Sequence, residues 1–214
     1  MISSRPQPDT PIRYAAIGAA LWIGAALVYV FLEALAAAAV VPAYSYARNL
    51  ISDLGVPAIS PRAGLMNSAF YLQGILFFSG AVLITRSVLA GKAWLFVGLA
   101  AANAIGNILV ATFTSGTGGL HTVGAVMAIV GGNAAILAGS SALHRAIGRL
   151  WYRAVSVSLA GVGFLSLTMF WVGSATAASY LLPVGTWERG SVCSILSWQT
   201  LTALCLIAPP AARR

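Results

Sequence analysis

Long apolar runs alternate with short polar connections along this chain of 214 residues. A helix needs about 20 predominantly apolar residues to cross a bilayer, and six runs come close to that length or exceed it. They cover about residues 14–41, 64–85, 93–112, 120–143, 154–179 and 191–208. The pattern predicts an all-α fold, a six-helix transmembrane bundle that forms a single domain over residues 14–208.

Polar connections join the predicted spans. Short ones are expected at residues 86–92, 113–119, 144–153 and 183–190. The longest covers residues 42–63, mixes apolar with polar residues and has a proline near each end. It predicts a short interfacial helix or a re-entrant loop between the first two spans. The first span is too long for the apolar part of a signal peptide and contains Glu33, so a retained span is favoured over a cleaved leader.

The distribution of lysine and arginine predicts the orientation in the membrane. With six spans, both termini lie on one side, and that side collects nine basic residues: Arg5, Arg13, Arg86, Lys92, Arg145, Arg149, Arg153, Arg213 and Arg214. The other side has only Arg48, Arg62 and Arg189. Because basic residues accumulate in cytoplasmic loops, we expect a cytoplasmic, disordered tail at residues 1–13 and a second cytoplasmic tail at 209–214.

Composition agrees with a chain solvated by lipid. Hydrophobic residues make up 59% of the chain, charged residues 7%, and the mean hydropathy is +0.89. A soluble domain carries roughly 25% charged residues and could not cover its surface with so few. The net charge of +8 forms no basic stripe, so nucleic acid is not expected as a partner. The charge instead indicates topology and attraction to anionic lipid head groups.

Scarce acidic residues on the non-cytoplasmic side are the first candidates for chemistry. A charged Glu33 in the membrane centre would cost about 2.5–3.5 kcal/mol on insertion scales, so it is expected to face the bundle. Asp53 could serve as an acid or base, cap a short helix, or pair with Arg48. Glu188 and Arg189 stand together in the last outer connection, where they could anchor a loop. Arg189 could alternatively bind a phosphate or pair with Asp53.

A single histidine lies on the same side. His121 follows the glycine-rich stretch 115–119 and opens the fourth span. It could act as a general base or metal ligand, or hydrogen-bond to a loop carbonyl. The backbone amides of such a turn, together with a helix N-terminus, can receive an anion such as a lipid phosphate. One histidine and three carboxylates are a thin set for a metal, and neither metal nor cofactor is defined by the sequence.

These residues are predicted to line one polar cleft that opens to the outer leaflet. The candidate catalytic residues are Asp53, His121 and Glu188. The candidate ligand-binding residues are Glu33, Arg48, Asn49, Ser52, Asn67, Asn107 and Arg189.

The sequence also resembles a known family. The resemblance depends on the segment Asn49-Leu-Ile-Ser-Asp-Leu-Gly, on Asn67, on the histidine that opens the fourth span, and on Glu188-Arg189. These features resemble the bacterial and archaeal membrane family called Domain of Unknown Function 998, over about residues 15–207. A more distant similarity is to the Frag1/DRAM/Sfk1 group of eukaryotic membrane proteins, some of which handle lipids. The resemblance implies a six-helix membrane protein and no established activity, and the expected location is the bacterial inner membrane.

Three functions are compatible with this pattern. The first is a lipid-directed protein, either a hydrolase, a transferase or a lipid-binding protein, with membrane lipids as partners. The second is a non-enzymatic scaffold, sensor or accessory subunit that assembles with a membrane partner or with itself. The third is a small proton-coupled transporter that uses Glu33, which requires polar residues through the cytoplasmic half of the bundle; the sequence places few there.

Overall fold

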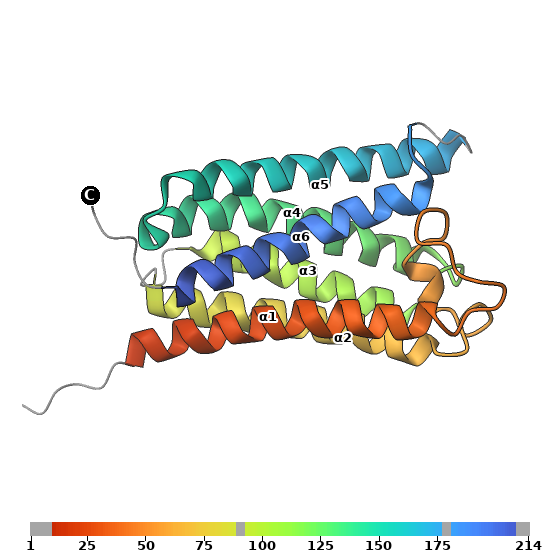
Figure 1. Ribbon diagram of the computed structural model, residues 1–214, viewed down its shortest axis with the longest axis horizontal. Helices are drawn as coiled ribbons and strands as arrows, with labels where there is room; N and C mark the ends of the chain where they lie inside the picture. The colour runs from red at the N-terminus through yellow and green to blue at the C-terminus, as the bar shows by residue number, and fades with distance from the viewer. Residues whose placement is uncertain (1–9, 89–92, 177–180, 209–214) are drawn as a thin grey trace, which may run out of the picture.

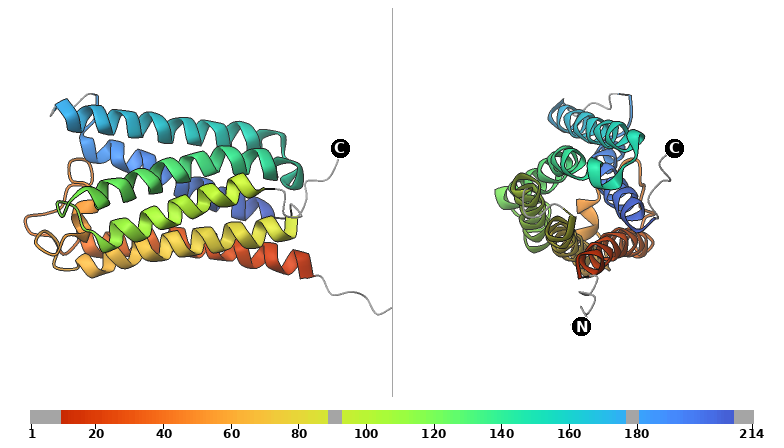
Figure 2. Two further views of the ribbon diagram at one scale, coloured as in Figure 1. Left: turned by 180° about the vertical axis from the view of Figure 1, so that it is seen from behind. Right: turned by 90° about the vertical axis from the view of Figure 1, so that its left-hand side faces the viewer.

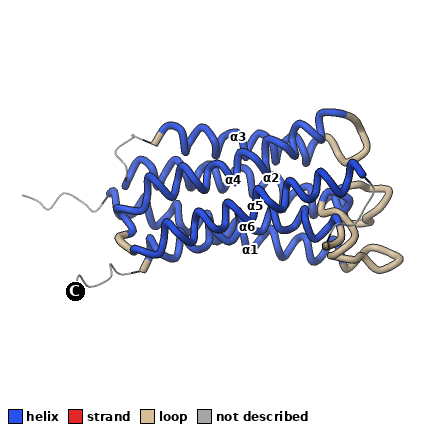
Figure 3. Tube along the Cα trace, turned by 90° about the horizontal axis from the view of Figure 1, so that it is seen from above, coloured by secondary structure: helices blue, strands red, loops and turns tan. Residues whose placement is uncertain are grey.

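A computed structural model describes residues 10–88, 93–176 and 181–208. This part of the chain folds into six α-helices and one 3-10 helix, with no strand (Figure 3). They are α1 (Thr10–Ala37), η1 (Ser52–Gly55), α2 (Ala63–Val88), α3 (Trp94–Thr112), α4 (Gly119–Ile147), α5 (Leu150–Thr176) and α6 (Val184–Ile207). All six α-helices are long and apolar enough to cross a membrane, which confirms the predicted all-α bundle.

The helices run along the long axis of the molecule and form a closed ring (Figures 1 and 2). Each helix packs against the next in the sequence, and α6 packs against both α5 and α1. The start of α1 and the end of α6 lie at the same end of the bundle (Figure 1). The segments 38–62, 113–118 and 181–183 lie at the opposite end, which we call the loop end.

An aromatic cluster fills the interior away from the loop end. Trp22 of α1 stacks on Phe77 of α2 at 5.4 Å between ring centroids, and it also contacts Phe96 of α3 and Trp198 of α6. The Trp22 indole donates a hydrogen bond to the Phe77 carbonyl (2.8 Å), so its polar atom is satisfied inside the core. Because the rings come from four helices, the cluster fixes the bundle on which the loop end is built.

Several helix boundaries differ from the predicted ones by a few residues, and two of these differences change the interpretation. The last helix begins at Val184, seven residues before the predicted start at 191, so Glu188 and Arg189 are helical and not part of a turn. Charged residues are typical of a connection, but the side chains of Glu188 and Arg189 are mostly buried against the bundle, and both residues belong to α6. The predicted basic connection 144–153 is also wrong, because α4 continues to Ile147 and ends where Gly148 adopts a φ of 66°.

The first connection contains the short helix that was expected. The 3-10 helix η1 occupies Ser52–Gly55, and the rest of segment 38–62 consists of turns and extended residues. Ile51 and Leu54 are fully buried and pack in one cluster with Met66 and Ala69 of α2. These two apolar side chains hold the segment on the bundle, so it forms a cap over the loop end.

Candidate functional site

Arg189 fastens segment 38–62 to α1 and α6. Its Nη2 donates to Glu33 Oε1 at 2.9 Å, in an ion pair whose side chains are 14% and 12% exposed. Its Nη1 donates to the carbonyls of Tyr46 (2.6 Å) and Asn49 (2.9 Å), and the guanidinium lies over the rings of Tyr44 and Tyr46. The sequence suggested Asp53 or a phosphate as possible partners of Arg189. The carboxylate that pairs with Arg189 in the structure is that of Glu33.

Tyr44 completes this clamp. Arg189 Nη2 donates to the Tyr44 hydroxyl, which donates in turn to the Leu50 carbonyl at 2.7 Å. Burial raises the pKa of the Tyr44 hydroxyl well above its usual value, although the neighbouring Arg189 guanidinium opposes the rise. The hydroxyl therefore stays protonated and keeps its donor role at any physiological pH.

The other predicted residues of the segment shape its backbone. Asp53 Oδ2 accepts the Leu50 N–H at 3.0 Å, and Asn49 Oδ1 accepts the Ser45 N–H at 2.8 Å. Asn67 Nδ2 donates to the Gly55 carbonyl at 3.0 Å and holds the end of η1 on α2. Arg48 is exposed. The Asp53 carboxylate therefore stabilises a turn, which was the alternative to an acid or base role. No ion pair between Asp53 and Arg48 is observed among the described residues.

Glu188 precedes Arg189 in α6 and points about 100° away from it around the helix axis. It is 8% exposed, and its Oε2 accepts the Ile51 N–H at 2.5 Å. The segment 38–62 thus supplies a donor to this carboxylate, and within the described part of the chain Glu188 has no salt-bridge partner. A buried carboxylate needs hydrogen bonds or a cation to offset its desolvation; the backbone of Ile51 and of Ser52 supplies hydrogen bonds, and a carboxylate with about four acceptor sites can accept more from a ligand.

His121 sits in the first turn of α4. Its Nδ1 lies 2.8 Å from the Phe113 carbonyl oxygen. Because a carbonyl only accepts, Nδ1 carries the proton and Nε2 of the neutral ring is left as an acceptor. The histidine therefore makes the loop-carbonyl contact that was one of its predicted alternatives, and this contact leaves the ring with a free basic nitrogen.

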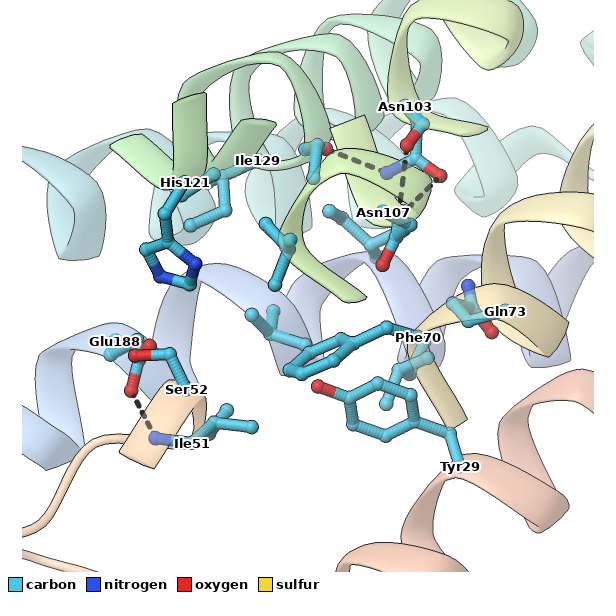
Figure 4. A pocket seen from close by; sticks show the side chains of 16 residues that line it. Tyr29, Ile51, Ser52, Phe70, Gln73, Asn103, Asn107, His121, Ile129 and Glu188 are labelled. Carbon is cyan, nitrogen blue, oxygen red and sulfur yellow. Dashed lines mark hydrogen bonds between the residues drawn. The ribbon is translucent and has the colours of Figure 1, made fainter. Parts of the chain in front are cut away.

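Two neighbouring cavities meet at Glu188 and His121. Both cavities are lined by Ser52, His121, Ala125, Ile129 and Glu188. The inner cavity extends from there into the bundle (Figure 4) and has a volume of about 50 Å³, enough for a few water molecules. The lateral cavity extends between α4 and α5 and has a volume of about 180 Å³.

Polar side chains of the bundle line the inner cavity, and most are satisfied. Asn103 Nδ2 donates to the Ala128 carbonyl at 2.6 Å, Asn107 Nδ2 donates to the Asn103 carbonyl at 3.0 Å, and Gln73 bonds Gln199. Tyr29 is the exception, because its hydroxyl is buried and has no hydrogen-bond partner. Buried hydroxyls are nearly always bonded, so Tyr29 points to a group that occupies the cavity.

The lateral cavity is apolar beyond its polar end. Its wall on α5 consists of Leu167, Phe170 and Trp171, and Val126 faces them from α4. The α5 helix packs loosely, since 22% of the residues in its most apolar stretch are buried, compared with 50% for α2 and α4. The cavity therefore lies beside a helix that exposes most of its surface to the surroundings of the bundle, which for a membrane protein is lipid.

The structure divides the predicted residues into two groups. Ser52, Asn107, His121 and Glu188 line the inner cavity. The remaining six line neither cavity and hold segment 38–62 or lie exposed: Glu33, Arg48, Asn49, Asp53, Asn67 and Arg189. Sequence reasoning missed Tyr29, whose only signal was a tyrosine inside an apolar run. Among the described residues, no group of three His, Cys, Asp or Glu side chains could hold a metal ion.

The fold and the site together define a multi-pass integral membrane protein with a cavity, lined in part by polar side chains, near one end of a six-helix bundle. A family model described as "Protein of unknown function (DUF998)" matches residues 22–205. The chain belongs to this family, as the sequence features around Asn49 and Glu188 predicted. A search of the curated proteins and a search of the solved structures gave no match.

Proposed function

We propose that this protein is lipid-directed: it binds a lipid of the outer leaflet of the bacterial inner membrane, with the alkyl chain in the lateral cavity and the head group at Glu188 and His121. One observation carries the proposal. The two ionisable side chains stand, with Ser52, at the shared end of two cavities whose surfaces are otherwise mostly apolar, and a polar end joined to an apolar space matches the two halves of an amphiphile.

The orientation in the membrane supports the choice of leaflet. Nine basic residues fall on the side of the termini and three on the side of the loop end, so the loop end is proposed to face away from the cytoplasm. The route of entry supports the choice of ligand. The cavity lies between α4 and the sparsely buried α5, and Leu167 and Phe170 offer an apolar wall to a solute that enters from the hydrocarbon region.

The geometry also provides acid-base groups. The free Nε2 of His121 can accept a proton, and the Glu188 carboxylate faces the same cavity, which are the groups a hydrolase uses to activate water. We propose lipid binding rather than lipid hydrolysis. An activated nucleophile would be a hydroxyl or thiol hydrogen-bonded to His121, and none is found among the described residues. Release of a cleaved lipid by the purified protein would extend the proposal to an enzyme.

A cavity-filling substitution tests the proposal. Ala125 lines both cavities, so Ala125→Phe should displace the lipid, whereas Val123→Phe on the exposed face of the same helix should not. Native mass spectrometry of the purified protein should show lipid on the wild type and on Val123→Phe, and at least tenfold less on Ala125→Phe. Val126→Phe, which fills only the lateral cavity, serves as a second variant if Ala125→Phe does not fold. Equal lipid on all folded variants would refute the proposal.

A scaffold, sensor or accessory subunit is the second candidate, and the Arg189 clamp favours it. Polar residues that the sequence offered for ligand binding instead hold segment 38–62 on the bundle. In that case cavity filling would change thermal stability while any bound lipid stayed the same. Proton-coupled transport is not proposed, because Glu33 is paired with Arg189 and the aromatic cluster around Trp22 fills the bundle beyond the cavity.

A further inference from the structure

We infer that the lipid has a single alkyl chain and a small, uncharged head group that carries hydroxyls, such as a monoacylglycerol, and that anionic head groups are excluded. The inference rests on the proposed function and names the ligand class of the same site. It follows from the charges that line the cavities, from the unpartnered hydroxyl of Tyr29, and from the size of the inner cavity.

The charges exclude an anion. No lysine or arginine is found among the described residues that line either cavity, whereas Glu188 lines both. Arg189 is adjacent in the sequence, but successive residues of a helix point about 100° apart. Its terminal nitrogens are occupied by Glu33, Tyr44 and backbone carbonyls, and its buried Nε does not line either cavity. A phosphate or carboxylate would therefore be placed beside the Glu188 carboxylate without a lysine or arginine to balance it.

The hydrogen-bonding groups select a hydroxyl. The Glu188 carboxylate can accept further hydrogen bonds, and the Nε2 of His121 accepts one. Tyr29 is 2% exposed, its hydroxyl has no partner, and it lines the inner cavity, where it requires an acceptor to donate to. A hydroxyl group both donates and accepts, so it can satisfy Glu188 and Tyr29; an ammonium group only donates and would leave Tyr29 unpaired.

The size of the two cavities restricts the ligand further. A volume of about 50 Å³ accommodates a few water molecules, and so one hydroxyl-bearing arm of a small head group in place of them, with the rest of the head group in the shared end of the lateral cavity. A sugar or a phosphocholine group is larger. The lateral cavity, about 180 Å³ between Val126 and Trp171, takes a stretch of one chain. The inferred ligand is therefore a single-chain lipid with an uncharged hydroxyl head group.

The test compares lipids with the same chain and different head groups. The purified full-length protein is mixed at pH 8 with monooleoylglycerol, oleylamine or oleoyl lysophosphatidic acid, and bound lipid is measured by native mass spectrometry. We expect monooleoylglycerol to bind at least tenfold more tightly than lysophosphatidic acid, with oleylamine between them. Glu188→Gln removes the negative charge and keeps the shape, so it should reduce this preference to less than threefold.

A hydroxyl deletion tests the Tyr29 contact. Tyr29→Phe should weaken monooleoylglycerol binding by about two- to tenfold, the value of one hydrogen bond, and leave lysophosphatidic acid unchanged. Tyr71→Phe is the matched control, because the Tyr71 hydroxyl bonds Thr112 away from both cavities. Equal or tighter binding of lysophosphatidic acid by the wild type, or an unchanged affinity of Tyr29→Phe, would overturn the head-group assignment while lipid binding itself remained. Absence of binding by all three lipids would overturn the proposed function as well.

Discussion

Breaking the ion pair between Glu33 and Arg189 should strongly destabilise the loop end. Arg189→Met removes the guanidinium that donates to Glu33, to Tyr44 and to the carbonyls of Tyr46 and Asn49. It also leaves the Glu33 carboxylate, 12% exposed, without a cation. Glu33→Gln is the milder change, because the amide oxygen can still accept from Arg189 while the charge is lost.

The magnitudes follow from how buried the pair is. Removing one partner of a buried ion pair costs about 3–5 kcal/mol, mainly because the other charge is left uncompensated. With exposures of 14% and 12% the Arg189–Glu33 pair is close to this limit, so Arg189→Met should lower the free energy of unfolding by about 3–5 kcal/mol. Glu33→Gln retains a hydrogen bond and should cost about 1–3 kcal/mol. The double variant Glu33→Gln/Arg189→Met should cost less than the sum of the two, with a coupling energy of about 1–3 kcal/mol.

Unfolding in mixed dodecyl maltoside and sodium dodecyl sulfate micelles, followed by circular dichroism, gives these free energies. Arg189→Lys is the informative control, because it keeps the positive charge and loses the planar fork that reaches two carbonyls and a carboxylate together. We expect the free energy of unfolding of Arg189→Lys to lie between those of the wild type and Arg189→Met. Additive single effects, or a loss below about 1 kcal/mol for Arg189→Met, would show that the ion pair contributes little to the stability of the fold.

Two further predictions concern the packing and the orientation of the bundle. Gly106→Ala would place a Cβ against the backbone nitrogen of Ala128 in α4 and should destabilise the protein by about 1–3 kcal/mol in the same unfolding assay. Gly98→Ala on the same helix meets nothing within 4 Å and should be neutral or stabilising, so equal losses for both would contradict the close helix contact. In a background without native cysteines, Val41→Cys at the exposed loop end should react with a membrane-impermeant maleimide on intact cells, whereas the equally exposed Leu150→Cys should not. The reverse labelling would place the cavity on the cytoplasmic side.

The number and order of the helices were predictable because lipid imposes a simple rule on the sequence. Every span must satisfy its backbone internally and present apolar side chains for about 20 residues, and this leaves a long, unbroken signal. The boundary of α6 was not predictable by the same rule. Glu188 and Arg189 are polar, yet they are helical, because each meets partners from segment 38–62 that lie 137 and 140 residues away in the sequence.

The sequence indicated the end of the bundle at which the candidate site lies, but only some of the residues that line it. Residue type alone identified His121 and Glu188, because ionisable residues at the edge of a membrane bundle are rare. Residue type could not distinguish these two cavity-lining residues from Asp53 and Asn67, which hydrogen-bond backbone groups of segment 38–62. That segment is mostly non-helical, so its contacts leave no periodic pattern in the sequence. Tyr29 was missed for the opposite reason. A tyrosine in an apolar run is compatible with core packing, and only the unsatisfied hydroxyl distinguishes it.

The clamp and the cavity are physically linked although they share no ionisable residue. Glu188 and Arg189 leave α6 in different directions, so one helix turn binds segment 38–62 through Arg189 and receives the Ile51 N–H of the same segment through Glu188. Ser52, which lines both cavities, is placed by that contact. Loss of Arg189 should therefore weaken lipid binding at a site that it does not line. In Glu33→Gln, where the segment keeps its carbonyl contacts to Arg189, binding should be largely retained, because the carbonyl contacts position the cavity and the ion pair mainly offsets the burial of the guanidinium.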